Sequence, residues 1–128
     1  MRCLIVDDSA GFIDAARGLL ECQGLSVVGV ASTSGEALRL FEEIRPDVTL
    51  VDINLGRESG FELAEQLHQV GGSTPSPVIL ISTHAAQDFA DMIETSPAVG
   101  FLSKSALTGA AIRDLVDGLA SVEEGDHR

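Results

Sequence analysis

The chain has 128 residues, of which 45% are hydrophobic and 4% aromatic, and this length allows one domain with a single apolar core. Eight basic residues against twenty acidic ones give a formal charge of −12, which disfavours direct binding to nucleic acid and to anionic membrane surfaces. No apolar run has the length of a membrane span, and the amino end lacks a signal-peptide pattern. Cys3 and Cys22 have neither metal-binding nor redox spacing. We therefore expect a cytoplasmic protein.

The amino end has the pattern of a buried strand that leads into an amphipathic helix. Residues 2–6 form a brief apolar run that stops at Asp7-Asp8-Ser9. Helical spacing follows, and Gly24 is a plausible end for the helix. The expected inner face of this helix consists of Phe12, Ala16, Leu19 and Leu20.

A second strand and helix follow the same order. Residues 25–31 predict the strand, and Thr33 with Glu36 three positions later has the spacing of a capping box. Pro46 ends the helix, because proline disfavours helical geometry in the residue before it. Its expected buried residues are Leu38, Phe41 and Ile44.

The most apolar stretch of the chain surrounds one acid. Residues 48–55 read as a short strand that is buried on both faces, and Asp52 lies near its end. An unpaired acid in such a position is costly to bury, so the fold must solvate it or supply cations. Residues 56–60 are then expected to form a loop before a third helix, whose inner face is predicted to contain Phe61, Ala64, Leu67 and Val70.

Two further strands complete the pattern. Residues 71–77 are rich in turn formers and predict a long surface loop, after which the fourth strand, at 78–81, ends in Ser82-Thr83-His84. A weaker helix is expected at about 86–95, with Phe89 and Ile93 inward.

The fifth strand, at 98–102, ends in Ser103-Lys104-Ser105. A last helix is lined by Leu107, Ala111, Leu115 and Leu119. We therefore expect one domain over residues 1–120 and a polar carboxyl-terminal tail over 121–128.

Five strands that alternate with five helices predict a mostly parallel sheet with both faces covered, since parallel neighbours need crossover connections. Sites in such α/β folds lie beyond the carboxyl ends of the strands. The residues expected at this edge are Asp7, Asp8, Asp52, Ser82, Thr83 and Lys104. Clustered carboxylates repel one another unless a cation neutralises them, and Mg²⁺ prefers oxygen ligands. With a metal in place, one carboxylate could attack a phosphoryl group, while Lys104 and a hydroxyl stabilise its oxygens.

From Cys3 to about Leu119 the chain resembles the receiver domains of two-component response regulators. The resemblance is carried by Asp7-Asp8, Asp52 in Val-Asp-Ile-Asn-Leu, Gly60, Ser82 in Ile-Leu-Ile-Ser-Thr, and Lys104 in Gly-Phe-Leu-Ser-Lys. It implies a flavodoxin-like (βα)5 fold with a five-stranded parallel sheet in the order 2-1-3-4-5. The segment that contains Lys104 looks closer to receivers that precede helix-turn-helix effector domains.

The resemblance also implies a role for each residue of the set. Asp52 would be the phosphoacceptor, and Asp7, Asp8, Asp52 and the backbone carbonyl of Asn54 would hold Mg²⁺. Ser82 would be the switch hydroxyl, with Thr83 as the second candidate, Lys104 would pair with the phosphate, and Phe101 would change rotamer on activation.

The implied function is phosphoryl transfer from a histidine kinase or a phosphotransfer protein to Asp52. This reaction would switch the face made by the fourth helix, fifth strand and fifth helix, and thereby a downstream effector domain or protein, with a homodimer as a further possibility. The chain would not be an enzyme beyond phosphorylation and dephosphorylation of its own aspartate.

Three other functions are compatible with parts of the pattern. A degenerate receiver would bind partners without phosphorylation, although the intact set of acids, hydroxyl and lysine argues against it. A metal-dependent aspartyl phosphatase usually has a second acid two residues after the nucleophile, where this chain has Asn54. A flavin-binding electron carrier would need a phosphate loop where Asp7 and Asp8 stand.

One departure from the family concerns the loop after Asp52. Gly56 stands where many members have proline, and we expect it to loosen that loop.

Overall fold

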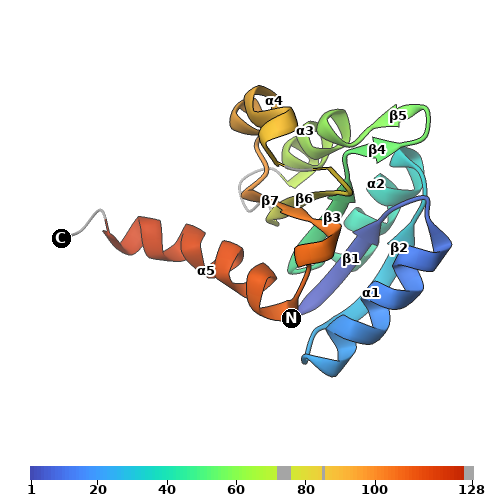
Figure 1. Ribbon diagram of the computed structural model, residues 1–128, viewed down its shortest axis with the longest axis horizontal. Helices are drawn as coiled ribbons and strands as arrows, with labels where there is room; N and C mark the ends of the chain where they lie inside the picture. The colour runs from blue at the N-terminus through green and yellow to red at the C-terminus, as the bar shows by residue number, and fades with distance from the viewer. Residues whose placement is uncertain (72–75, 85, 126–128) are drawn as a thin grey trace.

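The structure is a computed structural model that describes residues 1–71, 76–84 and 86–125 (Figure 1). Most of the predicted loop at 71–77, the side chain of Leu119 and the last three residues of the predicted tail lie outside the described parts. Within the described parts, no helix combines the length and the apolar character that crossing a membrane requires.

Five parallel strands form the central sheet in the order β2-β1-β3-β6-β7. Numbered by their place along the chain within this sheet, the strands have the order 2-1-3-4-5, so the predicted flavodoxin-like fold is confirmed. Their bounds are β1 Arg2–Val6, β2 Ser26–Ala31, β3 Val48–Asp52, β6 Val78–Ser82 and β7 Gly100–Ser103. Residues of β1, β3 and β6 are buried on both sides, which explains their continuous apolar runs.

Helices cover the two faces of the sheet. They are α1 Ala10–Cys22, α2 Ser34–Ile44, α3 Gly60–Gly71, α4 Ala90–Thr95 and α5 Gly109–Gly125, with short 3₁₀ turns at Ala86–Phe89 and Lys104–Ala106. One core lies under α2 and α3, and its largest helical residue is Phe41. The other lies under α1 and the first turns of α5, where Leu20 and Ile112 are fully buried. The far end of α5 extends away from the body of the domain and reaches Gly125, beyond the predicted limit at residue 120 (Figure 1).

Local hydrogen bonds explain where two of the helices begin. The Ser9 side chain caps α1 by accepting a hydrogen bond from the Phe12 amide at 3.4 Å. Thr33 caps α2 by accepting from the Glu36 amide at 3.2 Å, as the capping-box spacing predicts. The Glu36 carboxylate, however, accepts from the amide of Ser32 at 2.8 Å and not from that of Thr33.

The predicted inner faces were wrong or incomplete in four helices; Ala37 of α2 and Leu63 of α3, for example, are fully buried although they were not predicted. Leu19 is 40% exposed and Val70 is 36% exposed, whereas Ile112, which was absent from the predicted face of the last helix, is fully buried. In α1 the buried line runs through residues four apart, Ala16 and Leu20, and Leu19 is turned about 100° away from Leu20. In α5 the error arose because Leu107 was counted as helical, although it lies before the helix and therefore does not share its phase.

The segment after Asp52 is a hairpin and not the expected loop. Strands β4 (Asn54–Leu55) and β5 (Glu58–Ser59) pair antiparallel, with Gly56 and Arg57 in the turn. Gly56 has a φ of 67°, and a positive φ at only the first turn position is the pattern of a type II′ hairpin. Proline cannot adopt this φ, so glycine here permits a tight turn, and the expectation that it loosens this segment stays a prediction.

Candidate phosphoryl-acceptor and metal site

The register of the sheet brings the predicted residues to one edge. Val6 pairs with Val51, so Asp7, directly after β1, lies level with Asp52, the last residue of β3. On the other side of β3, Asp52 pairs with Ile81, and Ser82 comes next. Ser82 pairs with Ser103 of β7, and Lys104 comes next. The alignment of strand ends that the sequence predicted therefore exists in the structure.

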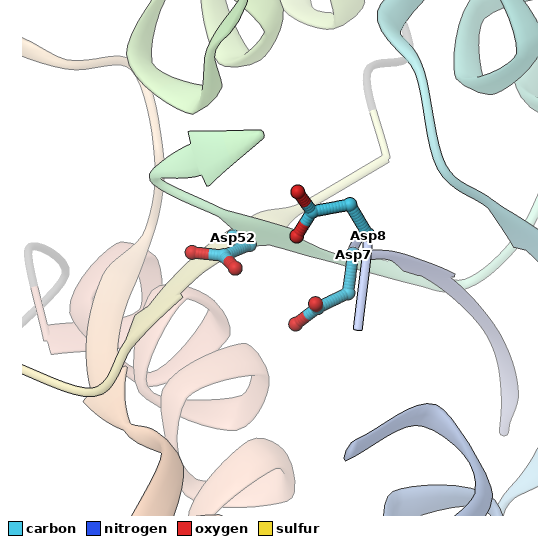
Figure 2. Close-up of side chains that lie close together, drawn as sticks. All are labelled: Asp7, Asp8 and Asp52. Carbon is cyan, nitrogen blue, oxygen red and sulfur yellow. The ribbon is translucent and has the colours of Figure 1, made fainter. Parts of the chain in front are cut away.

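Three carboxylates face a common space at this edge, as Figure 2 shows. Asp7 and Asp8 come from the segment between β1 and α1, and Asp52 comes from the end of β3. One oxygen of each lies within 4.8 Å of the others. Asp7 is fully buried, Asp52 is 6% exposed and Asp8 is exposed, so the site opens to solvent on the Asp8 side.

The carboxylate of Asp52 is fixed by one donor on each oxygen. Oδ1 accepts a hydrogen bond from the Asn54 amide at 3.0 Å, and Oδ2 accepts one from Lys104 Nζ at 3.1 Å. Burial raises the pKa of Asp52, the Asn54 amide and Lys104 oppose this rise, and the nearby Asp7 charge adds to it. The net result is a pKa above the usual value of an aspartate.

Lys104 lies between two acids. Its Nζ is 2.7 Å from Asp7 Oδ2 and 3.1 Å from Asp52 Oδ2, and only 13% of the side chain is exposed. Burial alone lowers the pKa of Lys104, but its contacts with Asp7 and Asp52 together raise that pKa above the usual value. The ammonium is therefore charged at neutral pH and offsets part of the negative charge of the site.

The surroundings of Asp7 suit a further cation. Its Oδ1 accepts a hydrogen bond from the Ser9 amide at 2.8 Å. Its Oδ2 is buried and, among the described residues, has no donor in hydrogen-bond geometry, although Lys104 Nζ is close to it. Three carboxylates this close together, with the single ammonium of Lys104 between Asp7 and Asp52, fit a small hard cation such as Mg²⁺.

The hairpin after Asp52 packs beside this site. A Cβ added at Gly56 would lie 3.5 Å from Asp8 Oδ2, so the turn is next to the exposed acid. The Glu58 carboxylate accepts a hydrogen bond at 2.9 Å from the amide of Ser34, the first residue of α2. The hairpin is thus held against a helix amino end, where a negative charge is favourable.

The remaining predicted residues lie at different depths. Ser82 is 2% exposed and accepts a hydrogen bond from the His84 amide at 3.0 Å, whereas Thr83 is exposed. Phe101 lies on β7 and packs, partly buried, against the core under α2 and α3. Asn54 contacts Asp52 through its backbone N–H, and the residue is exposed. Of the two hydroxyls, Ser82 is therefore the buried one.

Sequence reasoning missed two neighbours of the site. Phe12 was expected only as core, yet Lys104 Nζ lies 4.3 Å from the centroid of its ring. Gly60 was noted for its resemblance to the family, but its close packing was not predicted: a Cβ there would lie 2.1 Å from the Asp52 carbonyl oxygen. The sequence offered weak signals for both: Phe12 stands three residues after Ser9, and Gly60 stands at the start of a predicted helix.

Comparison with known proteins gives a consistent result. The family model described as "Response regulator receiver domain" matches residues 3–117. An uncharacterized transcriptional regulatory protein of Bacillus subtilis, YvfU, is 29% identical over 126 residues, which cover 98% of this chain and 60% of that protein. The chain spans 49% to 60% of the first curated relatives that it matches.

Two solved structures have the same fold. A LuxR-family two-component response regulator from Aurantimonas sp. SI85-9A1 has a TM-score of 0.82 and 30% identity, covering 91% of this chain and 85% of that one. The receiver domain of the response regulator NarL from Mycobacterium tuberculosis has a TM-score of 0.80 and 28% identity, covering 91% and 96%. With the fold and the match over residues 3–117, the chain belongs to the family of response regulator receiver domains.

Proposed function

We propose that this receiver accepts a phosphoryl group on Asp52 and transmits the change to a partner. The observation that carries the proposal is the contact set of Asp52: one oxygen on the Asn54 amide, the other on Lys104, and two more carboxylates within 4.8 Å. Such a set orients a nucleophile and provides for both charge compensation and a cation.

The proposed metal ligands are Asp7, Asp8 and Asp52, together with the backbone carbonyl of Asn54. Mg²⁺ bound there would supply positive charge to the phosphoryl oxygens. Asp7 supports this role because its carboxylate is fully buried beside those of Asp8 and Asp52, and the ammonium of Lys104 offsets only part of their negative charge. Asp8 supports it because its exposed carboxylate leaves an open path from solvent.

The transfer itself uses the side chains of the chain. An oxygen of Asp52 attacks phosphorus, the new O–P bond forms, and the P–N bond of a phosphohistidine breaks, with its electron pair leaving on the imidazole. Lys104 then stabilises the phosphoryl oxygens that replace its present carboxylate partners. Hydrolysis reverses the state, because water attacks the same phosphorus and releases inorganic phosphate and the free Asp52 carboxylate.

The signal is proposed to pass through Ser82 and Phe101. Ser82 is at the buried end of β6, and its hydroxyl accepts a hydrogen bond from the His84 backbone N–H, which leaves the hydroxyl proton to be redirected. A phosphoryl group adds charge and strong acceptors near this hydroxyl. An inward shift of Ser82 would give the half-buried Phe101 ring room to turn and would reshape the face of α4, β7 and α5.

The proposed phosphoryl donor is a histidine kinase or a phosphotransfer protein. The proposed recipient of the signal is an effector domain or a separate protein, and control of transcription is the output that the names of two relatives suggest. A homodimer and a cytoplasmic location stay predictions. The reaction takes place on the chain's own side chain and turns over no other substrate.

The test is phosphoryl uptake from acetyl phosphate, a small acyl phosphate donor. We expect the wild-type chain with Mg²⁺ to gain one phosphoryl group, measured by intact-protein mass spectrometry, and to gain none after chelation. Asp52→Asn should abolish uptake, whereas Asp14→Asn, an exposed acid on α1, should not change it. Unchanged uptake by Asp52→Asn would refute the proposal. Absence of uptake by the wild-type chain, together with no binding of beryllofluoride and Mg²⁺, would favour the degenerate receiver.

A further inference from the structure

The ring of Phe12 completes the surroundings of the Lys104 ammonium. Nζ has Asp7 at 2.7 Å, Asp52 at 3.1 Å and the Phe12 centroid at 4.3 Å. A cation this close to an aromatic face is attracted by the ring quadrupole, and the attraction grows when the pair is shielded from water. Because only 13% of the Lys104 side chain is exposed, the contact is largely shielded.

The position of this ring is set by the turn that also orients Asp7. The Ser9 amide donates to Asp7 Oδ1 at 2.8 Å, and the Ser9 hydroxyl accepts from the Phe12 amide at 3.4 Å. The ring of Phe12 in turn packs against the core under α1 and α5. Contacts thus run from Asp7 through Ser9 and Phe12 to Lys104 and back to Asp7.

The three partners of Lys104 respond differently to phosphorylation. Metal binding would draw the charge of Asp7 toward the cation, and phosphorylation would convert the Asp52 carboxylate into an ester-like group. Both changes weaken the present ion pairs. The ring of Phe12 carries no net charge and takes no part in the transfer, so its attraction for the ammonium persists in every state.

We propose that Phe12 is a positioning residue that keeps Lys104 beside the site while its carboxylate partners are replaced by phosphoryl oxygens. This inference rests on the proposed function, because it assigns Lys104 to the phosphoryl group. It adds a residue that touches neither the metal ligands' oxygens nor the phosphoryl group. The expected effect is that Lys104 loses little side-chain conformational entropy when it binds the phosphoryl group.

The first experiment measures the contact in the metal-free protein. Because the chain has no Trp or Tyr, urea unfolding is followed by circular dichroism. Phe12→Leu, Lys104→Met and the double variant form a cycle. We expect the double variant to lose less stability than the sum of the two single variants. Strict additivity would show that ring and ammonium do not interact and would overturn the inference.

The second experiment separates the electrostatic role of the ring from its packing role. Replacing Phe12 by 3,4,5-trifluorophenylalanine keeps a ring of similar shape but removes most of the negative potential over its face. We expect the affinity for beryllofluoride with Mg²⁺, measured by isothermal titration calorimetry, to fall about 3- to 10-fold in this variant and in Phe12→Leu. Phe12→Tyr should retain the wild-type affinity, since its ring also attracts cations.

The outcomes distinguish the two proposals. Equal beryllofluoride affinity for the trifluoro variant and wild type would overturn the role of Phe12 while leaving the receiver function intact. A wild-type protein that binds no beryllofluoride in the presence of Mg²⁺ would instead fail the proposed function itself. Ile13→Leu, which changes the neighbouring partly buried residue of α1, is the matched control and should leave the affinity unchanged.

Discussion

Asp52 combines burial with reactivity, and its immediate contacts reconcile the two. A carboxylate that is 6% exposed would be strongly disfavoured without partners, yet it has a backbone amide on one oxygen and an ammonium on the other. The remaining desolvation still raises its pKa. A higher pKa also makes a carboxylate a better nucleophile once it is ionised, so the environment that is costly for folding would favour the proposed transfer.

Gly60 fixes the backbone behind Asp52. A Cβ at this position would lie 2.1 Å from the Asp52 carbonyl oxygen and 2.6 Å from Ile53 Cα, and both are backbone atoms with little room to move. We expect Gly60→Ala to lower the free energy of unfolding by about 1–3 kcal/mol and to slow phosphoryl uptake, because β3 must shift. Urea unfolding and uptake from acetyl phosphate measure the two effects.

Gly18→Ala is the control for this substitution. Nothing lies within 4 Å of a Cβ at Gly18, which is inside α1 and exposed. Alanine should therefore stabilise the helix by about 0.5–1 kcal/mol and leave uptake unchanged. Wild-type stability and uptake in Gly60→Ala would show that the close packing at residue 60 is not a constraint.

Thr49 has a buried hydroxyl in the middle of the sheet. It is fully buried on β3, and no partner for its Oγ1 exists among the described residues. Valine has a similar shape without the hydroxyl, so Thr49→Val should raise the free energy of unfolding by about 1–2 kcal/mol. Thr49→Ser retains the hydroxyl and loses a methyl group, and it should destabilise. A less stable Thr49→Val would mean that the hydroxyl makes a hydrogen bond, for example to a buried water.

Strand ends were predictable because each follows an apolar run. The acids, the serine and the lysine stop four such runs or stand directly after them, and parallel topology then brings them to one edge. The hairpin of β4 and β5 was not predictable in this way, since strands of two residues are too short to show periodicity. Its signal was Gly56, which was interpreted through the family's proline and not through the φ that a two-residue turn requires.

The hairpin predicts that proline, which many receiver domains have at the position of Gly56, is unfavourable in this chain. Gly56 has a φ of 67°, whereas proline fixes φ near −65°, so Gly56→Pro should break the turn and lower the free energy of unfolding by about 1 kcal/mol or more. Gly56→Asn, which tolerates a positive φ, should cost less. Thermal unfolding by circular dichroism ranks the variants. Equal or higher stability of Gly56→Pro would indicate that the hairpin does not persist in solution.

Contacts between distant parts of the chain set the limit of sequence reasoning. Phe12 follows the helical pattern of α1 and was correctly assigned to the core, but its contact with Lys104 depends on where the segment after β7 comes to lie. The buried face of α5 was misplaced for a related reason, because the 3₁₀ turn at Lys104–Ala106 delays the start of the helix. Periodicity predicts elements well, but it does not fix their phase after such a turn.

The domain as a unit gathers its candidate site residues at one edge of the sheet. Its net charge of −12 makes direct contact with nucleic acid unfavourable, so a regulatory output would pass through another domain or protein. The first curated relatives that it matches are longer, since the chain covers 49% to 60% of their length. A phosphoryl group on Asp52 would be the only signal that such a partner must read, and its preference for the phosphorylated face sets the strength of the response.

The most direct measurement locates the phosphoryl group on the chain. The wild-type protein is treated with acetyl phosphate and Mg²⁺, and the product is reduced with borohydride, which converts a phosphorylated aspartate to homoserine. Peptide mass spectrometry then identifies the converted residue. We predict conversion at Asp52 and at no other acid, dependent on Mg²⁺. Conversion at Asp7 or Asp8, or a phosphorylated protein in which Asp52 remains unmodified, would contradict the account.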